Sequence, residues 1–298
     1  MNTMLERFEA IRQQITDQTL LLDTNLSVTI RRLDQIHPQI SGNKFFKLKY
    51  NLIEAQRLGY RQILTFGGAY SNHIAATAYA AQRFGFESIG IIRGEELATQ
   101  ALNPTLSTAV QHGMQLHFVS RGVYRQKHLP DYLAQLQQHY PHAYILPEGG
   151  SNYLAVLGCQ EILSHQDQQD FDVICAAVGT GGTLAGIITA SAAQQQLLGF
   201  SALQGDFLTQ AVQQHLPNLH PQNNWQITDD YCCGGYAKTT PELLKFIDQF
   251  QQRHAIPLEP IYTGKMLYGI MDLISKQYFK AGTRILVIHS GGLQGKFE

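Results

Sequence analysis

A glycine-rich loop is the stretch of the sequence best suited to bind a ligand. Three glycines and two threonines stand together at Gly179-Thr180-Gly181-Gly182-Thr183. An apolar, β-branched run precedes them at 173–178, and residues of helical character follow at 184–193. A strand, a glycine loop and a helix start form an anion site, because backbone N–H groups converge at the positive end of the helix dipole. A tight strand-to-helix turn, the structural alternative, needs one glycine rather than three.

The loop sequence narrows the range of anions that the site could bind. In GTGGTLAG at 179–186, Leu184 stands where a GxGxxG motif has its third glycine, and the chain contains no GxxxxGK. A dinucleotide and a nucleoside triphosphate are therefore disfavoured. A single phosphate monoester is favoured, with hydroxyl donors supplied by Thr180 and Thr183.

One lysine stands apart from its neighbours. Lys44 follows Gly42-Asn43 at a turn where a helix towards Gly59 begins, whereas Lys49 is interpreted as part of a solvated helix face. A lysine at a turn and a phosphate site together suggest pyridoxal phosphate. That cofactor needs a lysine for its Schiff base, a cup for its phosphate and a partner for its ring nitrogen. In the alternative, Lys44 is a solvated group of a non-catalytic α/β protein that binds a phosphate ligand.

The elements that position these residues alternate along the chain, which predicts an α/β fold of open parallel sheets with helices on both faces. Polar groups follow the strands at 71–73, 148–152, 179–183 and 289–292, the ends where such sheets bind ligands. The strands are predicted at 27–33, 62–66, 88–92, 116–120, 143–146, 173–178, 201–203 and 284–288. The helices are predicted at 1–22, 44–59, 74–84, 104–113, 130–139, 152–164, 184–193, from Thr240-Pro241, and at 264–279. Ser71, Asn103 and Ser151 are expected to cap three of them, and the glutamines at 194–196 are interpreted as a solvated helix face.

Composition excludes several classes of protein. The 298 residues carry a formal net charge of −1 without a basic block, so we expect no nucleic-acid partner. No apolar run reaches membrane-spanning length, and the first residues lack a signal-peptide core, so no membrane partner is expected. The four cysteines form no CxxC pattern, which fits a reducing cytoplasm. No metal-ligand spacing is present, so we expect no metal.

Six motifs, in order from residue 42 to residue 295, resemble the D-cysteine desulfhydrase and 1-aminocyclopropane-1-carboxylate (ACC) deaminase family. This family lies within the tryptophan-synthase-β-like group of pyridoxal phosphate enzymes (fold type II). The motifs are GNKFFKLKY at 42–50, GGAYSNH at 67–73, EGGSNYLAVLG at 148–158, VGTGGTLAG at 178–186, YTGKMLYGIMDLI at 262–274 and HSGGLQG at 289–295.

The resemblance implies a set of cofactor contacts. Lys44 matches the lysine that holds the cofactor covalently and moves the α-proton, and Asn72 matches the asparagine that hydrogen-bonds the ring oxygen. Ser290 is expected beside the ring nitrogen. The phosphate loop is matched by Thr180, Gly181, Gly182 and Thr183.

The resemblance also implies substrate contacts. Ser71, through the substrate carboxylate, Asn72 and His73 lie where the family contacts substrate, and Tyr262 matches a catalytic tyrosine that faces the reacting end. Tyr236 is a looser match to a second tyrosine, and Thr263, directly after Tyr262, is also expected to contact the substrate. Alternatively, His73 caps or packs at its helix start, and Tyr236 is an aromatic residue of a surface loop.

Two positions favour a desulfhydrase over a deaminase. ACC deaminases of the family carry a glutamate directly after the tyrosine matched by Tyr262, where this chain has Thr263, and an apolar residue where it has Ser290. A hydroxyl does not stabilise a protonated ring nitrogen as a carboxylate does. That weaker electron sink suffices when a thiolate leaves the β-carbon. We therefore expect α,β-elimination of D-cysteine or a related β-substituted amino acid, with ACC deamination as the alternative.

The family also implies an architecture. It predicts a large cofactor-binding domain from residues 1–45 and 155–298, and a small α/β domain from residues 46–154 inserted between them. The cofactor lies in the cleft, and a homodimer is expected.

Overall fold

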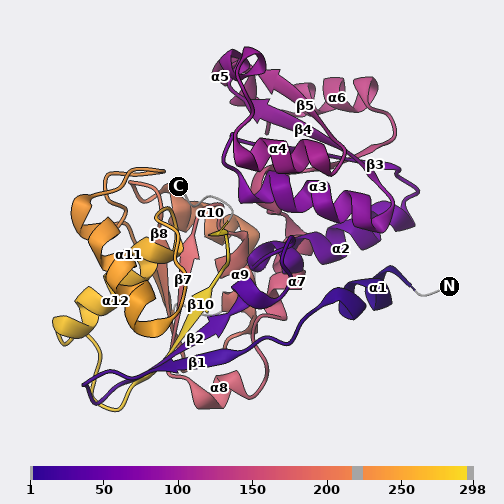
Figure 1. The fold of residues 1–298 in the computed structure, drawn as a ribbon. Helices are drawn as coiled ribbons and strands as arrows, with labels where there is room; N and C mark the ends of the chain where they lie inside the picture. The colour runs from indigo at the N-terminus through magenta and orange to yellow at the C-terminus, as the bar shows by residue number, and fades with distance from the viewer. Residues whose placement is uncertain (1–2, 217–223, 294–298) are drawn as a thin grey trace.

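The computed structural model describes residues 3–216 and 224–293, and it contains two sheets (Figure 1). The larger sheet has the strand order β1-β2-β10-β7-β8-β9, and the smaller has the order β5-β4-β3-β6. All neighbouring strands are parallel except β1 and β2, which are antiparallel. The predicted α/β class is confirmed. The last two residues of the HSGGLQG motif, 294 and 295, lie outside the described residues.

The strands of the larger sheet come from both ends of the chain, and those of the smaller sheet from between them. The larger sheet consists of β1 Asp17–Leu20, β2 Ser27–Arg32, β7 Val173–Val178, β8 Gln196–Ser201, β9 Trp225–Thr228 and β10 Arg284–His289. The smaller sheet consists of β3 Gln62–Gly67, β4 Glu87–Arg93, β5 Met114–Val119 and β6 Ala143–Leu146.

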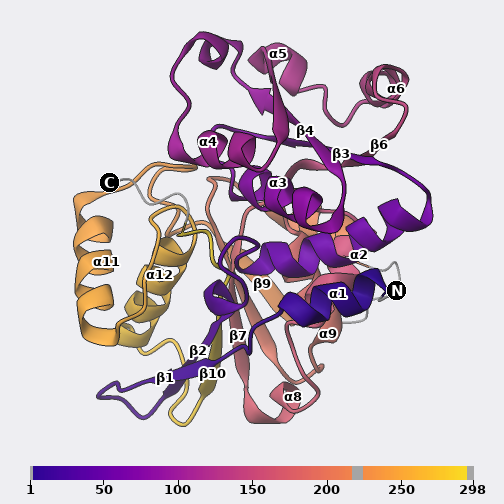
Figure 2. The ribbon, with the colours of Figure 1, turned by 45° about the vertical axis from the view of Figure 1, so that its right-hand side comes forward.

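Helices alternate with these strands and cover the sheet faces (Figures 1 and 2). They are α1 Met4–Ile11, α2 Asn43–Arg57, α3 Asn72–Phe84, α4 Pro104–Gln111, α5 Arg121–Tyr124, α6 Pro130–His139, α7 Tyr153–Gln160, α8 Asp167–Asp170, α9 Gly182–Ala190, α10 Phe207–His215, α11 Pro241–His254 and α12 Thr263–Ser275. No helix within the described ranges is long and apolar enough to cross a bilayer.

The central strand β7 shows why the larger sheet is buried on both faces. Its side chains alternate between two core clusters. Val173, Cys175 and Ala177 pack with α11 and α12, whereas Ile174, Ala176 and Val178 pack with α2, α7 and α9. Such a continuous apolar strand is typical of a parallel sheet with helices on both sides.

Helix α7 joins the two sheets' layers by packing against α2 and α9. A Cβ atom on Gly158 would lie 2.1 Å from the carbonyl oxygen of Phe46, and one on Gly186 would lie 2.5 Å from the Cβ of Cys159. Glycine at these positions lets three helices approach closely. The domain boundaries at 45/46 and 154/155 stay a prediction.

Several helix starts were predicted correctly. The Ser71 and Asn103 side chains accept hydrogen bonds from the backbone N–H of Ile74 and Leu106, and Thr240 caps α11 in the same way. Ser151 was predicted to cap the next helix, but Asn152 does so, since its side chain accepts from Ala155 N–H.

Other predictions were wrong. The helix predicted over 1–22 ends at Ile11, because Asp17–Leu20 pairs with β2 as an edge strand. Of the strand predicted at 201–203, only Ser201 lies in a strand, as the last residue of β8, which begins at Gln196. Gln195, interpreted as part of a solvated helix face, is buried and donates to the carbonyl oxygens of Asp167 and Phe171. Periodicity could not reveal these partners.

Lys49 is also not part of a solvated face. Only 3% of it is exposed, and its ammonium pairs with Glu9 at 2.6 Å and Glu161 at 2.8 Å. Both carboxylates come from other elements, so the pattern of α2 alone could not predict the pairing.

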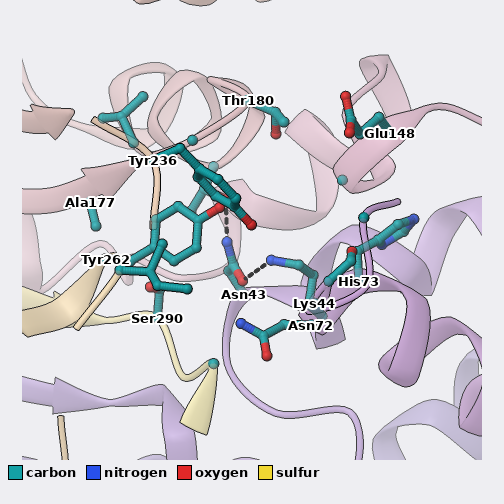
Figure 3. A pocket seen from close by; sticks show the side chains of 18 of the residues that line it. Asn43, Lys44, Asn72, His73, Glu148, Ala177, Thr180, Tyr236, Tyr262 and Ser290 are labelled. Carbon is teal, nitrogen blue, oxygen red and sulfur yellow. Dashed lines mark hydrogen bonds between the residues drawn. The ribbon is translucent and has the colours of Figure 1, made fainter. Parts of the chain in front are cut away.

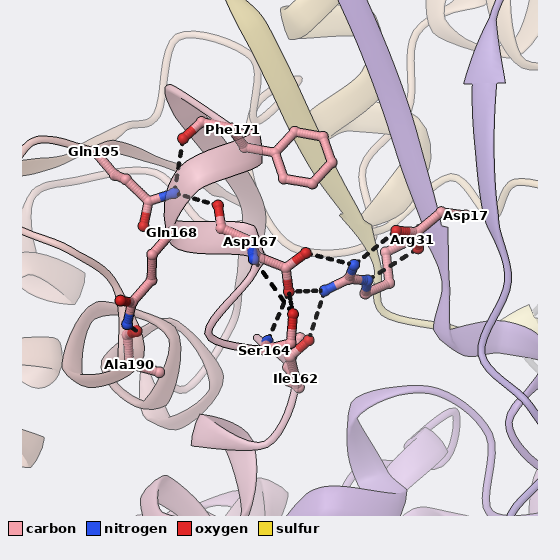
Figure 4. Close-up of polar contacts among 9 residues, drawn as sticks. All are labelled: Asp17, Arg31, Ile162, Ser164, Asp167, Gln168, Phe171, Ala190 and Gln195. Carbon is pink, nitrogen blue, oxygen red and sulfur yellow. Dashed lines mark hydrogen bonds and ion pairs between the residues drawn. The ribbon is translucent and has the colours of Figure 1, made fainter.

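A half-buried arginine ties β2 of the larger sheet to the segment before β7 (Figure 4). The Arg31 guanidinium binds both carboxylate oxygens of Asp167, at 2.6 and 2.9 Å, as well as Asp17 and the carbonyl oxygen of Ile162. Burial disfavours the charged carboxylate, but hydrogen bonds from Arg31 and Ser164 lower the pKa of Asp167.

We predict that Asp167→Asn destabilises the fold by about 2 kcal/mol, because the half-buried Arg31 guanidinium loses one of its two carboxylate partners. The lowered pKa means that this contribution is present above about pH 4 and is lost as the pH falls further. Chemical denaturation between pH 3 and 8 measures the difference between variant and wild type. Glu96→Gln, which removes an exposed partner of Arg121, is the matched control. An equal effect of both variants would contradict the assignment.

Candidate active site

A cavity of about 380 Å³ lies where the strand ends of the two sheets meet (Figure 3). Most of the predicted site residues line it. They are Lys44, Ser71, Asn72, His73, Thr180, Gly181, Thr183, Tyr236, Tyr262 and Ser290. Gly182 and Thr263 do not line it. In Figure 3, Asn43 and Lys44 lie between the two tyrosine rings on one side and His73 on the other.

The start of α2 places Lys44 in the cavity. Gly42 precedes this helix with a φ of +66°, and a Cβ atom there would lie 1.8 Å from the carbonyl oxygen of Ser290. The Lys44 ammonium donates to the Asn43 side chain at 2.8 Å, and Asn43 in turn donates to the Thr183 hydroxyl at 2.8 Å. This chain of hydrogen bonds links the lysine to the glycine loop.

Burial, together with the nearby charge of Lys47, lowers the pKa of Lys44 to about 7. A large fraction of the amine is therefore neutral at pH 7, whereas an ordinary lysine with a pKa near 10.4 is almost fully charged. A neutral amine is both a nucleophile towards an aldehyde and a base.

The glycine loop has the geometry of an anion cup. It connects β7 to the N-terminus of α9, and Gly181 adopts a φ of +82° that favours glycine. The Thr180 and Thr183 hydroxyls line the cavity beside it. The loop therefore offers N–H and O–H donors at the positive end of a helix.

Sequence reasoning missed a cation at this cup. Lys47 is 2% exposed and donates to the carbonyl oxygen of Gly149 and to the hydroxyls of Ser151 and Thr180, at 2.8–3.2 Å. Burial lowers its pKa to about 8. The signal in the sequence was its spacing from Lys44, because residues i and i+3 of a helix share a face.

The N-terminus of α3 presents Ser71, Asn72 and His73. The Asn72 Oδ1 atom is buried and has no hydrogen-bond partner among the described residues. His73 is 2% exposed, and its Nε2 lies 2.8 Å from the Thr65 hydroxyl. Burial and the two lysines hold the pKa of His73 well below its ordinary value, so the ring is neutral. Its contacts fit the packing interpretation.

Two tyrosines form the opposite wall. The ring centroids of Tyr236 and Tyr262 lie 6.2 Å apart, with the ring planes inclined by 65°. Burial raises the pKa of both, for Tyr262 well above its ordinary value, so both phenols carry their protons at neutral pH. Tyr236 is 39% exposed but lines the cavity, so it is more than a surface aromatic.

A buried carboxylate that the sequence did not reveal fixes Tyr262. Glu259 accepts hydrogen bonds from the backbone N–H groups of Ile261, Tyr262 and Thr263 at the start of α12. The Thr263 hydroxyl donates to the same carboxylate at 3.0 Å and is fully buried. Thr263 therefore faces Glu259 rather than the cavity, and the expected substrate contact is absent from this geometry.

These groups fit pyridoxal phosphate. Lys44, whose pKa is about 7, can bind the cofactor's aldehyde. The Asn72 side chain, whose Oδ1 has no partner among the described residues, can hydrogen-bond a ring substituent, and the anion cup with Lys47 can hold the phosphate. Residues 21–291 match the family described as pyridoxal-phosphate dependent enzyme. The chain belongs to this family. Its cofactor is pyridoxal phosphate, and the protein is a pyridoxal phosphate-dependent lyase.

Relatives cover most of the chain. A "Putative 1-aminocyclopropane-1-carboxylate deaminase" of Pyrococcus horikoshii is 30% identical over 91% of this chain and 86% of its own length. A "Bifunctional D-cysteine desulfhydrase/1-aminocyclopropane-1-carboxylate deaminase, mitochondrial" of Arabidopsis thaliana is 31% identical over 93% and 75%. A solved ACC deaminase homologue superposes with a TM-score of 0.80 at 27% identity and covers 100% of this chain and 97% of that one.

We predict that the rate at which the cofactor-free protein binds pyridoxal phosphate rises with pH through a midpoint near pH 7 to a plateau above about pH 8, because only the neutral Lys44 amine attacks the aldehyde. Lys47→Met should move the midpoint upwards, since it removes a repelling charge. Stopped-flow absorbance measures the rate. The exposed Lys238→Met is the control. A wild-type midpoint near pH 10 would refute the lowered pKa.

Proposed function

We propose that the protein catalyses β-elimination of D-cysteine to pyruvate, ammonia and sulfide. The observation that carries this proposal is a base and an acid in one cavity. Burial lowers the pKa of Lys44 to about 7 and raises that of Tyr262, so an amine able to accept a proton and a phenol able to donate one line the same space.

We assign the cofactor contacts first. When bound, pyridoxal phosphate withdraws electrons from the α-carbon of an amino acid, which makes the α-proton acidic. Lys44 holds the aldehyde carbon, Asn72 the ring oxygen, and Ser290 the ring nitrogen. The phosphate is held by Lys47 and by Thr180, Gly181, Gly182 and Thr183.

The substrate contacts follow from the same cavity. Ser71, at the N-terminus of α3, binds the substrate carboxylate together with Asn72, because the helix dipole favours an anion there. Lys44 Nζ takes the α-proton, and the Tyr262 hydroxyl, supported by Tyr236, donates a proton to the sulfur as the Cβ–S bond breaks. The 2-aminoacrylate released reacts with water to give pyruvate and ammonium.

The lack of a free carboxylate among the described lining residues favours D-cysteine over ACC as the substrate. Of the lining residues that the structure describes, Glu148 is the one carboxylate, and it is bound to Tyr124. Ser290 offers only a hydroxyl at the end of β10. A ring nitrogen beside a hydroxyl is a weaker electron sink than one beside a carboxylate, but it suffices for a thiolate leaving group. ACC deamination is the second candidate, since relatives carry that name.

We predict that the cofactor-loaded protein releases pyruvate and sulfide from D-cysteine and no 2-oxobutyrate from ACC. L-cysteine in parallel reports the stereochemical preference. Coupled assays of both keto acids, with sulfide measured separately, distinguish the products. Release of 2-oxobutyrate from ACC would favour the second candidate, and inactivity towards all three compounds would exclude both.

We predict that Tyr262→Phe lowers kcat for D-cysteine by about 10²-fold, the typical contribution of a general acid. Turnover of β-chloro-D-alanine should fall less, because chloride leaves without a proton. Tyr153→Phe, at a position 74% exposed and outside the cavity, is the control. Equal losses for both substrates would show that Tyr262 positions the substrate rather than protonating the sulfur.

We also propose that the protein is a cytoplasmic homodimer with a small domain over 46–154 inserted into a large one. The four cysteines, all free, support a reducing compartment. The strands of the smaller sheet, which all lie between residues 62 and 146, support the inserted domain. Sedimentation equilibrium tests the dimer, and cell fractionation tests the location.

A further inference from the structure

A charged cluster lies at the end of the cavity formed by the smaller sheet. Arg93 stands at the end of β4 and Glu148 just after β6, and both line the cavity. Between them, the Tyr124 hydroxyl donates to Glu148 at 2.6 Å, and the Arg93 guanidinium lies 5.9 Å from the Tyr124 ring centroid. The mechanism above uses none of these three side chains.

The negative charge of Glu148 is already balanced by partners within this cluster. The Lys127 ammonium lies 3.4 Å from its second oxygen and 4.9 Å from the centre of the Tyr124 ring. One carboxylate thus has both a phenol and an ammonium as partners. It has little capacity left to attract a cation into the cavity.

The side chain of Arg93, in contrast, has no ion pair or hydrogen bond with any residue in the described part of the chain, and its guanidinium lies against the Tyr124 ring. Its guanidinium passes over Gly68, where an added Cβ atom would lie 3.4 Å from Nη2. Gly68 belongs to the same loop as Ser71. Arg93 is therefore a cation without a counter-ion beside the substrate-binding loop.

The two lysines among the described lining residues, Lys47 and Lys44, have hydrogen-bond partners. Lys47 binds a carbonyl and two hydroxyl oxygens at the phosphate cup, and Lys44 donates to Asn43. The substrate's own carboxylate is assigned to Ser71 and the start of α3. The Arg93 guanidinium lies on β4, the neighbour of the strand β3 that leads into the Ser71 loop. It suits a second anionic group, because its planar N–H donors match a carboxylate.

We propose that the protein acts on β-substituted amino acids whose leaving thiol carries a negative charge of its own, such as a carboxylate, and that Arg93 binds this distal group. This proposal rests on the β-elimination proposed above. The Cα–H and Cβ–S bonds break, Lys44 takes the proton, and the leaving thiol gains a proton from Tyr262. The thiol departs with its carboxylate, and the 2-aminoacrylate takes up water to give pyruvate and ammonium.

The test compares two substrates of nearly the same shape, S-carboxymethyl-D-cysteine and S-carbamoylmethyl-D-cysteine, which end in a carboxylate and a neutral amide. For the wild type we expect kcat/KM to be about tenfold or more higher for the carboxylate, since charge-assisted hydrogen bonds outweigh neutral ones. Arg93→Met should bring this ratio down to about 1, and Arg93→Lys should leave it in between. Arg121→Met, which changes an exposed arginine paired with Glu96, should leave the ratio as in the wild type.

Two outcomes would overturn the proposal. A wild-type ratio near 1 would show that no distal charge is recognised. An equal loss for both substrates in Arg93→Met would show that Arg93 binds the substrate's own carboxylate instead.

Dissociation constants separate this proposal from the elimination itself. They can be measured for both compounds from the change in cofactor absorbance, without turnover. Preferential binding of the carboxylate that depends on Arg93, in a protein that eliminates nothing from D-cysteine, would retain the charge recognition and refute the proposed reaction. Elimination from D-cysteine without that preference would refute only the role of Arg93.

Discussion

The close approach of Gly42 to the end of β10 is the constraint on which the active site depends. A backbone without Cβ lets the start of α2 lie against Ser290, and the Asn43 N–H donates to the Ser290 carbonyl oxygen at 3.1 Å. Any side chain at residue 42 would collide with that carbonyl group. The contact joins the helix that carries Lys44 to the larger sheet and sets the lysine opposite the anion cup.

Burial at this junction creates the reactivity of the site. Two lysines of α2 enter the same water-poor space, where desolvation disfavours the charged form of both and the charge of Lys47 further disfavours that of Lys44. Lys47 keeps its place through three oxygen acceptors near the cup, whereas Lys44 has one, from Asn43. The same burial keeps Tyr262 protonated. Burial thus makes Lys44 a base on one wall of the cavity and keeps Tyr262 an acid on another.

Much of the fold could be predicted because local signals and tertiary structure agree. Ser71 caps α3 as expected, and the apolar run before Gly179 forms the central strand. Two of the failures share a cause, since Lys49 and Gln195 are polar residues whose partners lie on distant elements. A pattern within one helix or loop does not contain those partners. Polar residues at such positions therefore look solvated.

The sequence by itself determined the α/β class, the anion cup, Lys44 and the family, because these depend on local spacing and on motifs in a set order. Only the tertiary structure decided what surrounds them. It turned Thr263 towards Glu259, added Lys47 to the cup and left Arg93 without a counter-ion. Burial, pKa and charge balance are properties of neighbours in space, and the neighbours of these residues are brought together only when the two sheets pack.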